Sequence, residues 1–115
     1  MTKFNEDGSI EYTLGDTFIL DIVEASNTKT GQLINFADGW KVSFVIYTQG
    51  PKDNIIELKE TDAEINASVL GALLIKIAPD KLNMSIGKEY YYDFKLTDQD
   101  GLVDTWLKGK SISVK

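Results

Sequence analysis

The sequence predicts an all-β domain built as an antiparallel β-sandwich. Apolar and polar residues alternate with a period of two along much of the chain, which is typical of half-buried strands. Turn-forming residues separate these segments at short intervals, and only residues 61–70 leave a helix longer than one turn open as an alternative. The chain has 115 residues, of which 43% are hydrophobic. We therefore expect one domain over residues 1–115, with about seven or eight short strands in two packed sheets.

The first two predicted strands flank a turn at Gly15 and Asp16. Apolar residues alternate with polar ones over 10–14, and the pattern resumes over 18–22. A polar run over 26–32 then predicts a loop, because it offers no apolar face to a core.

The segments 40–48 and 89–96 show the strongest alternation. The even-numbered residues of the first are Trp, Val, Phe and Ile up to position 46, and those of the second are Tyr, Tyr, Phe and Leu. Because successive side chains of a strand point to opposite faces, the even-numbered residues of both strands should face the core.

Shorter segments complete the predicted sandwich. Strands are expected over 55–59, 72–78, 102–107 and 111–115, each bounded by turn residues. Pro79 fits the first position of a short helical turn over 79–84, between two of these strands.

Residues 61–70 leave two structures open. Thr61 and Glu64 have the spacing of a capping box, which predicts the start of one short helix. Gly71 and the surrounding strand pattern favour a turn and a strand instead.

Two aromatic residues indicate an immunoglobulin-like sandwich. Trp40 opens a central strand, and Tyr90 stands where such folds place the tyrosine that hydrogen-bonds back to the preceding corner. Tyr92 occupies the position of a cysteine in the usual inter-sheet disulfide, so an aromatic ring should fill the centre here.

The composition excludes many kinds of chemistry. The chain has no His and no Cys, and its 18 acidic residues outnumber its 12 basic residues for a net charge of −6. Thiol nucleophiles, imidazole triads, haem sites and zinc sites of the usual kind are excluded, and the negative field disfavours nucleic acids. We predict no catalytic residue, no cofactor and no metal.

The acidic turn around Asp98 and Asp100 does not change that prediction. Gly101 follows the second acid directly, which is wrong for an EF-hand loop, so a hairpin turn is expected. The acidic residues show no spacing that demands a hydrolase.

The sequence also predicts no membrane segment and no secretion by a signal peptide. The N-terminal residues 1–18 lack the apolar stretch of a signal peptide, and no apolar run approaches the length of a membrane span.

The hairpin register predicts which side chains face outward. A four-residue loop over 98–101 would pair Leu96 with Val103 and Tyr92 with Leu107, facing the core. Trp106 would then point away from the core.

Four residues are the candidate interaction surface: Val45, Tyr47, Tyr91 and Trp106. Outward Trp and Tyr side chains are typical of protein interfaces, because they bury a large area with few rotors. Two alternatives remain open: the loop over 26–38 or a helix covers these residues as part of the core, or the aromatics stack on sugars as in a carbohydrate-binding module.

The segment 87–114, GKEYYYDFKLTDQDGLVDTWLKGKSISV, resembles a recurring pattern in structural proteins of tailed bacteriophages. The motifs GDTF over 15–18, Trp40-Lys-Val and APDKLNMSIG over 78–87 are similar to it as well. The resemblance implies an immunoglobulin-like virion module, such as a baseplate N-terminal part, a tail or neck protein, or a capsid-decoration protein.

The same resemblance implies what such a module does. It would be non-enzymatic and would assemble with other virion proteins, as a homo-oligomer or within a symmetric assembly. It would be made in the host cytoplasm and end in the virion, with no nucleic-acid or membrane partner.

Overall fold

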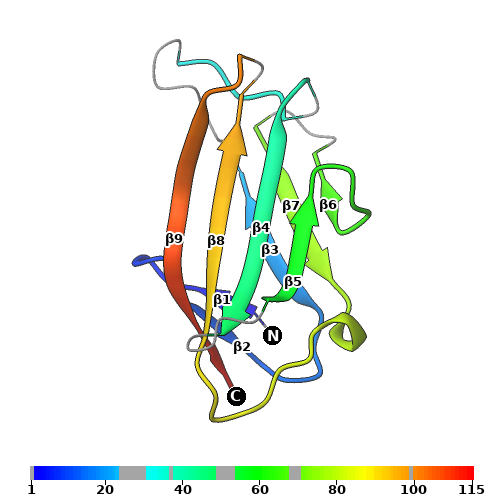
Figure 1. The fold of residues 1–115 in the computed structure, drawn as a ribbon, viewed down its shortest axis with the longest axis vertical. Coiled ribbons are helices and arrows are strands. Elements are labelled where there is room, and N and C mark those ends of the chain that lie inside the picture. Colours follow the sequence, from blue (N-terminus) through cyan, green and yellow to red (C-terminus); the bar gives the residue numbers. More distant parts are fainter. Residues whose placement is uncertain (1, 24–30, 37, 49–53, 68–70, 99) are drawn as a thin grey trace.

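The protein is an all-β, immunoglobulin-like sandwich, which confirms the predicted fold class (Figure 1). The computed structural model describes residues 2–23, 31–36, 38–48, 54–67, 71–98 and 100–115. Its strands are β1 (Thr2–Phe4), β2 (Ile10–Tyr12), β3 (Phe18–Ile22), β4 (Lys41–Thr48), β5 (Asn54–Lys59), β6 (Ile65–Asn66), β7 (Leu73–Ile77), β8 (Tyr90–Thr97) and β9 (Val103–Val114). One sheet has the order β1-β2-β9-β8-β4-β5 and the other β3-β7-β6.

The core lies between the two sheets. The even-numbered residues 42–46 of β4 and 90–96 of β8 are all buried, as their alternation predicts. The Phe44 ring lies 6.1 Å from the Phe18 ring of the opposite sheet and 5.6 Å from the Tyr92 ring of its own sheet. These aromatic rings therefore join the two sheets in one core.

Several predicted strands are confirmed, and two differ. β2, β3, β4, β5, β7 and β8 occupy predicted segments. β1 was not predicted, since three residues are too few to show a period; it pairs antiparallel with β2. The two strands predicted over 102–107 and 111–115 form one continuous strand, β9, which also pairs in parallel with β2.

Residues 61–67 form a turn and the short strand β6, with no helix. The Asp62 carboxylate accepts the Lys59 N–H at 2.7 Å, and the Asp62 carbonyl accepts the Ile65 N–H at 3.1 Å. Asp62 thus stabilises a tight turn at the position where the capping-box spacing predicted the start of a helix. Residues 68–70, and most of the loop predicted over 26–32, lie outside the described residues.

Of the helical turn predicted over 79–84, only the first half is helical, as the 3-10 turn η1 (Pro79–Lys81). It leads toward the corner before β8. There the Ser85 N–H donates to the Tyr90 hydroxyl at 2.8 Å, and Tyr90 is buried, as the tyrosine-corner prediction requires.

Tyr92 fills the centre of the sandwich, as predicted. Its side chain is fully buried, and its hydroxyl donates to the Gly8 carbonyl. Burial, with a smaller contribution from the charge of Asp7, raises the pKa of the Tyr92 hydroxyl well above its ordinary range.

No helix in the part of the chain that the structure describes is long and apolar enough to cross a membrane.

Candidate interaction surface

Three of the four predicted surface residues lie together on the outer face of the larger sheet. β4 and β8 are adjacent antiparallel strands, with Val45 opposite Asp93 and Tyr47 opposite Tyr91. Alternation turns these odd-numbered side chains away from the core. We call Val45, Tyr47 and Tyr91 the outer tyrosine patch.

The two tyrosines of the patch stack on each other. Their ring centroids are 6.1 Å apart, with 29° between the ring planes. The Tyr91 hydroxyl donates to Glu89 Oε2 at 2.9 Å, and this hydrogen bond raises the pKa of Tyr91. Tyr91 is half-buried and supplies much of the accessible aromatic surface of the patch.

Asp93 holds the Tyr47 ring close to the sheet. Asp93 Oδ1 accepts the Tyr47 hydroxyl at 3.0 Å and the Gly109 N–H at 2.7 Å. Tyr47 is only 8% exposed, and burial, followed by the hydrogen bond to Asp93, raises its pKa. The sequence placed Asp93 on this face but did not reveal its contacts. The sequence signal that could have pointed to the contact with Asp93 was Gly109, since an isolated glycine inside a strand often marks a bulge.

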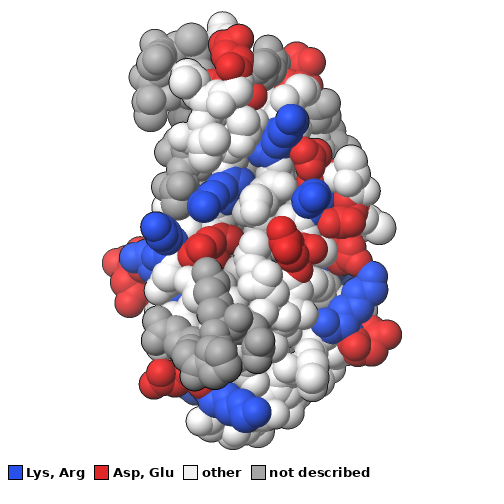
Figure 2. Space-filling view, viewed as in Figure 1, with Lys and Arg blue, Asp and Glu red and all other residues white. Residues whose placement is uncertain are grey.

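Charged residues surround the patch. Glu57 of β5 lies opposite Val45, and Lys59 and Lys95 flank Ser43 from the two neighbouring strands. Figure 2 shows basic and acidic side chains interspersed over this face of the molecule. An apolar and aromatic centre inside a mixed polar rim is the arrangement found in protein interfaces.

Trp106 does not belong to the patch, and its predicted outward orientation is wrong. Its ring centroid lies 5.8 Å from that of Phe94 and 6.1 Å from that of Phe36. Phe94 faces the core, so Trp106 packs on the inner side of the sheet. Phe36 belongs to the segment over 26–38, so this residue of the segment packs on Trp106 inside the core and not over the outer face of the sheet.

The hairpin between β8 and β9 explains the error. Thr97 pairs with Val103, so the loop has one more residue than the four predicted. The Asp98 carboxylate stabilises this longer loop by accepting the N–H groups of Asp100 and Leu102, both at 2.9 Å. A shift of one residue reverses the faces of a strand, and two irregularities around Phe94 shift the register further.

A hollow lies at the edge of the core beside Trp40. It has a volume of about 370 Å³, and Phe36, Glu60 and Asn66 line it together with Trp40. The Trp40 and Phe36 rings meet edge to face at 5.7 Å. An indole beside a carboxylate and an amide can stack on a sugar ring and hydrogen-bond its hydroxyls.

No group of three acidic side chains that could hold a metal ion occurs among the described residues. Asp98, the acid considered for calcium, directs one carboxylate oxygen at two backbone N–H groups of its own turn.

Comparison with known proteins gives a likeness in structure but none in sequence. No protein-family model and no curated protein matches the sequence. Among solved structures, murine CRIg is similar with a TM-score of 0.43 and 11% sequence identity, over 100% of this chain and 97% of that chain.

Proposed function

We propose that this protein is a non-enzymatic structural component of a tailed-phage virion, which assembles through protein contacts at the outer tyrosine patch. The observation that carries the proposal is the stacked pair of Tyr47 and Tyr91 on two central strands. Asp93 and Glu89 already hold the two hydroxyl groups. Little side-chain freedom would therefore be lost on binding, which favours association.

The proposed partners are other virion proteins, either copies of this chain or neighbours in a symmetric assembly such as a baseplate, tail, neck or capsid surface. The phage assignment draws on the sequence resemblance over 87–114. A net charge of −6 would keep the free protein soluble in the host cytoplasm before assembly.

Two measurements test the proposal. Light scattering over a concentration series gives the mass of the purified protein, and antibody labelling shows whether the protein is present in assembled particles. We expect a defined oligomer, or labelling of phage particles by an antibody against the protein. Val45→Lys should weaken that association at least about tenfold, because it places a solvated charge at the centre of the patch. Val103→Lys, at an exposed valine outside the patch, is the control. Monomeric protein that is absent from particles would contradict the proposal.

The hollow beside Trp40 supports a second candidate function, carbohydrate binding. Added oligosaccharides should then change the tryptophan fluorescence saturably in the wild type and in Trp106→Phe, but not in Trp40→Phe. No change across a broad panel of oligosaccharides would rule out this candidate.

A further inference from the structure

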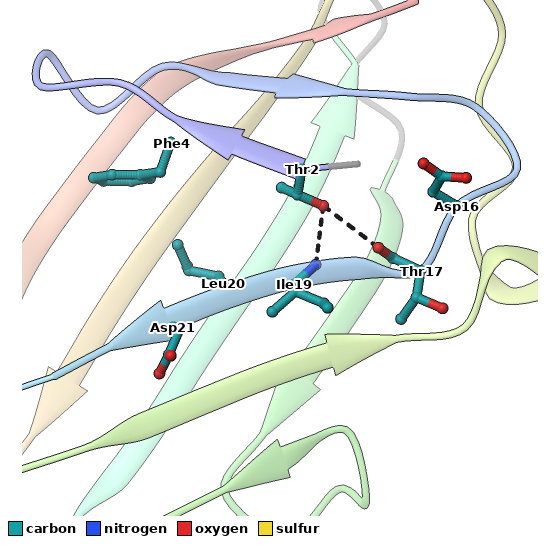
Figure 3. Close-up of a pocket in the computed structure, with 7 residues that line it drawn as sticks. All are labelled: Thr2, Phe4, Asp16, Thr17, Ile19, Leu20 and Asp21. Atoms are coloured by element: carbon teal, nitrogen blue, oxygen red, sulfur yellow. Dashed lines mark hydrogen bonds between the residues drawn. The ribbon is translucent and has the colours of Figure 1, made fainter.

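The first strands of the two sheets form an open groove. β1 is an edge of the larger sheet and β3 is an edge of the smaller one. In Figure 3 the two strands run side by side in the same direction, with space between them. Seven residues of β1, β3 and the turn before β3 line this groove, which has a volume of about 480 Å³. We call it the β1–β3 groove.

A single side chain closes one end of the groove. Thr2 Oγ1 accepts the Ile19 N–H at 3.1 Å and donates to the Thr17 carbonyl at 3.4 Å (Figure 3). These backbone groups of β3 therefore face β1 and not β7. The backbone N–H and C=O groups of successive residues in a strand point to opposite edges. Those of Asp21, two residues after Ile19, therefore face the same edge as those of Ile19. Thr2 does not reach that position, and no other described residue pairs with the Asp21 backbone on this edge.

The open end has an apolar floor. Phe4 and Leu20 both point into the space between β1 and β3 (Figure 3). Leu20 is 4% exposed, whereas Phe4 is 50% exposed. Ile19 and Val23 on the same edge are 44% and 63% exposed. An apolar side chain inserted between the strands would cover Phe4, and a strand edge with exposed apolar residues is a template for pairing.

The charge of the groove indicates what would bind there. Asp16 and Asp21 both line it, and none of its described lining residues is basic. Asp16 lies at the end that Thr2 closes, and Asp21 lies at the open end (Figure 3). A segment with Lys or Arg at its outward positions would complement the Asp21 carboxylate, whereas an acidic segment would be repelled. The alternation of a strand allows such a segment to direct apolar side chains inward at the same time.

We infer that the β1–β3 groove binds an extended segment of a partner protein in which apolar and basic residues alternate. The segment adds a strand to the edge of β3 beyond the Thr2 contact, with main-chain hydrogen bonds to Asp21. Its apolar side chains cover Phe4, and a basic side chain at an outward position faces Asp21. This is recognition by strand addition. The groove lies outside the outer tyrosine patch, so the inference does not depend on the virion role.

The test uses a fluorescent peptide of alternating Val and Lys that is long enough to span β3. Its control is a scrambled peptide of the same composition, because any basic peptide is attracted to an acidic protein. Binding is followed by fluorescence anisotropy, and the bound site is located by amide NMR shifts. We expect saturable binding with shifts over 19–23, and at least about tenfold weaker binding of the scrambled peptide.

Two substitutions at one position separate backbone pairing from charge. Asp21→Pro removes the N–H that faces the groove, which an edge strand tolerates, and should abolish binding. Asp21→Asn keeps the N–H and should weaken binding several-fold at low salt, while Asp80→Asn, an exposed acid of η1, should not. Asp21→Asn remains informative if the proline variant does not fold.

Four outcomes would overturn the inference. The two peptides could bind equally well, folded Asp21→Pro could bind as the wild type does, or the shifts could map to the outer tyrosine patch. Concentration-dependent self-association that Asp21→Pro abolishes would assign the groove to a second copy of this chain and would contradict a basic partner.

Discussion

Tyr91 and Tyr92 are neighbours in β8, yet their hydroxyl groups lie in opposite environments. Tyr91 stacks on Tyr47 at the surface, and its hydroxyl bonds the exposed Glu89. Tyr92 is fully buried, and its hydroxyl satisfies the Gly8 carbonyl from the opposite end of the chain. The same chemical group is therefore a surface contact at one position and a tertiary constraint at the next.

Replacing each of these tyrosines with phenylalanine should separate the two roles. Tyr92→Phe leaves the buried Gly8 carbonyl without its partner and should lower the free energy of unfolding by about 1 to 2 kcal/mol. Tyr91→Phe is the matched control and should change it by less than about 0.5 kcal/mol, since water replaces the lost hydrogen bond. Urea denaturation measures both values. Equal losses would contradict this reading of the two environments.

Tyr92 also predicts a loss of stability at alkaline pH. Its folded-state pKa lies above the ordinary value of 10.0, because burial disfavours the tyrosinate. In the unfolded chain the hydroxyl ionises near that ordinary value, so the folded state holds more protons above it. Tyr92 should therefore add no pH dependence to the free energy of unfolding below about pH 10. Above that pH this free energy should fall by up to about 1.4 kcal/mol per pH unit.

Denaturation curves across this alkaline range test the effect. Tyr92→Phe should have a shallower decline than the wild type, because it removes one group that must ionise on unfolding. Tyr12 and Tyr47, whose pKa values burial also raises, keep part of the decline in that variant. Parallel curves for the two proteins would exclude a contribution from Tyr92.

At the scale of elements, β9 decides the shape of the surface. Its pairing with β8 begins one residue later than a four-residue loop allows, and irregularities follow around Phe94. Trp106 is consequently turned toward Phe36 and Phe94. The outer tyrosine patch is smaller than the sequence predicted, and the core is larger.

The position of Trp106 predicts a role in stability. Trp106→Ala should lower the free energy of unfolding by about 2 to 3 kcal/mol, somewhat less than a fully buried Trp would, because the ring is only partly buried. Lys108→Ala, two residues further along β9 and exposed, should have almost no effect. Thermal or urea unfolding would compare the two. An unchanged free energy of unfolding in Trp106→Ala would contradict the inward packing of this side chain.

At the scale of the whole molecule, the two sheets share one core. Phe18 of the smaller sheet contacts Phe44 of the larger sheet, and Tyr12 contacts Phe18 at 5.7 Å between ring centroids. Neither sheet can bury these rings alone. The sandwich should therefore unfold as one cooperative unit.

This cooperativity is measurable with two probes. Tryptophan fluorescence reports the end of the core near Trp40 and Trp106, and far-ultraviolet circular dichroism reports the strands of both sheets. The two unfolding curves should coincide within error. Separate midpoints would show that the smaller sheet opens independently of the larger one.

The sequence by itself determined the fold class, the inward faces of β4 and β8, and the corner at Tyr90. These features depend on local rules: a period of two assigns the faces of a strand, and a tyrosine before a central strand marks the corner. Val45, Tyr47 and Tyr91 were placed on one face for the same reason. Their contacts with Asp93 and Glu89 required the structure, since hydrogen-bond partners depend on rotamers and strand pairing.

Only the tertiary structure decided the side on which Trp106 lies and the existence of the β1–β3 groove. The first depends on one extra loop residue and on bulges in β9, and a shift of one residue reverses every side chain of a strand. The second arises where the edges of two sheets meet, between a three-residue strand and residues a dozen or more positions away. Alternation within a strand carries no information about which edge another sheet leaves open.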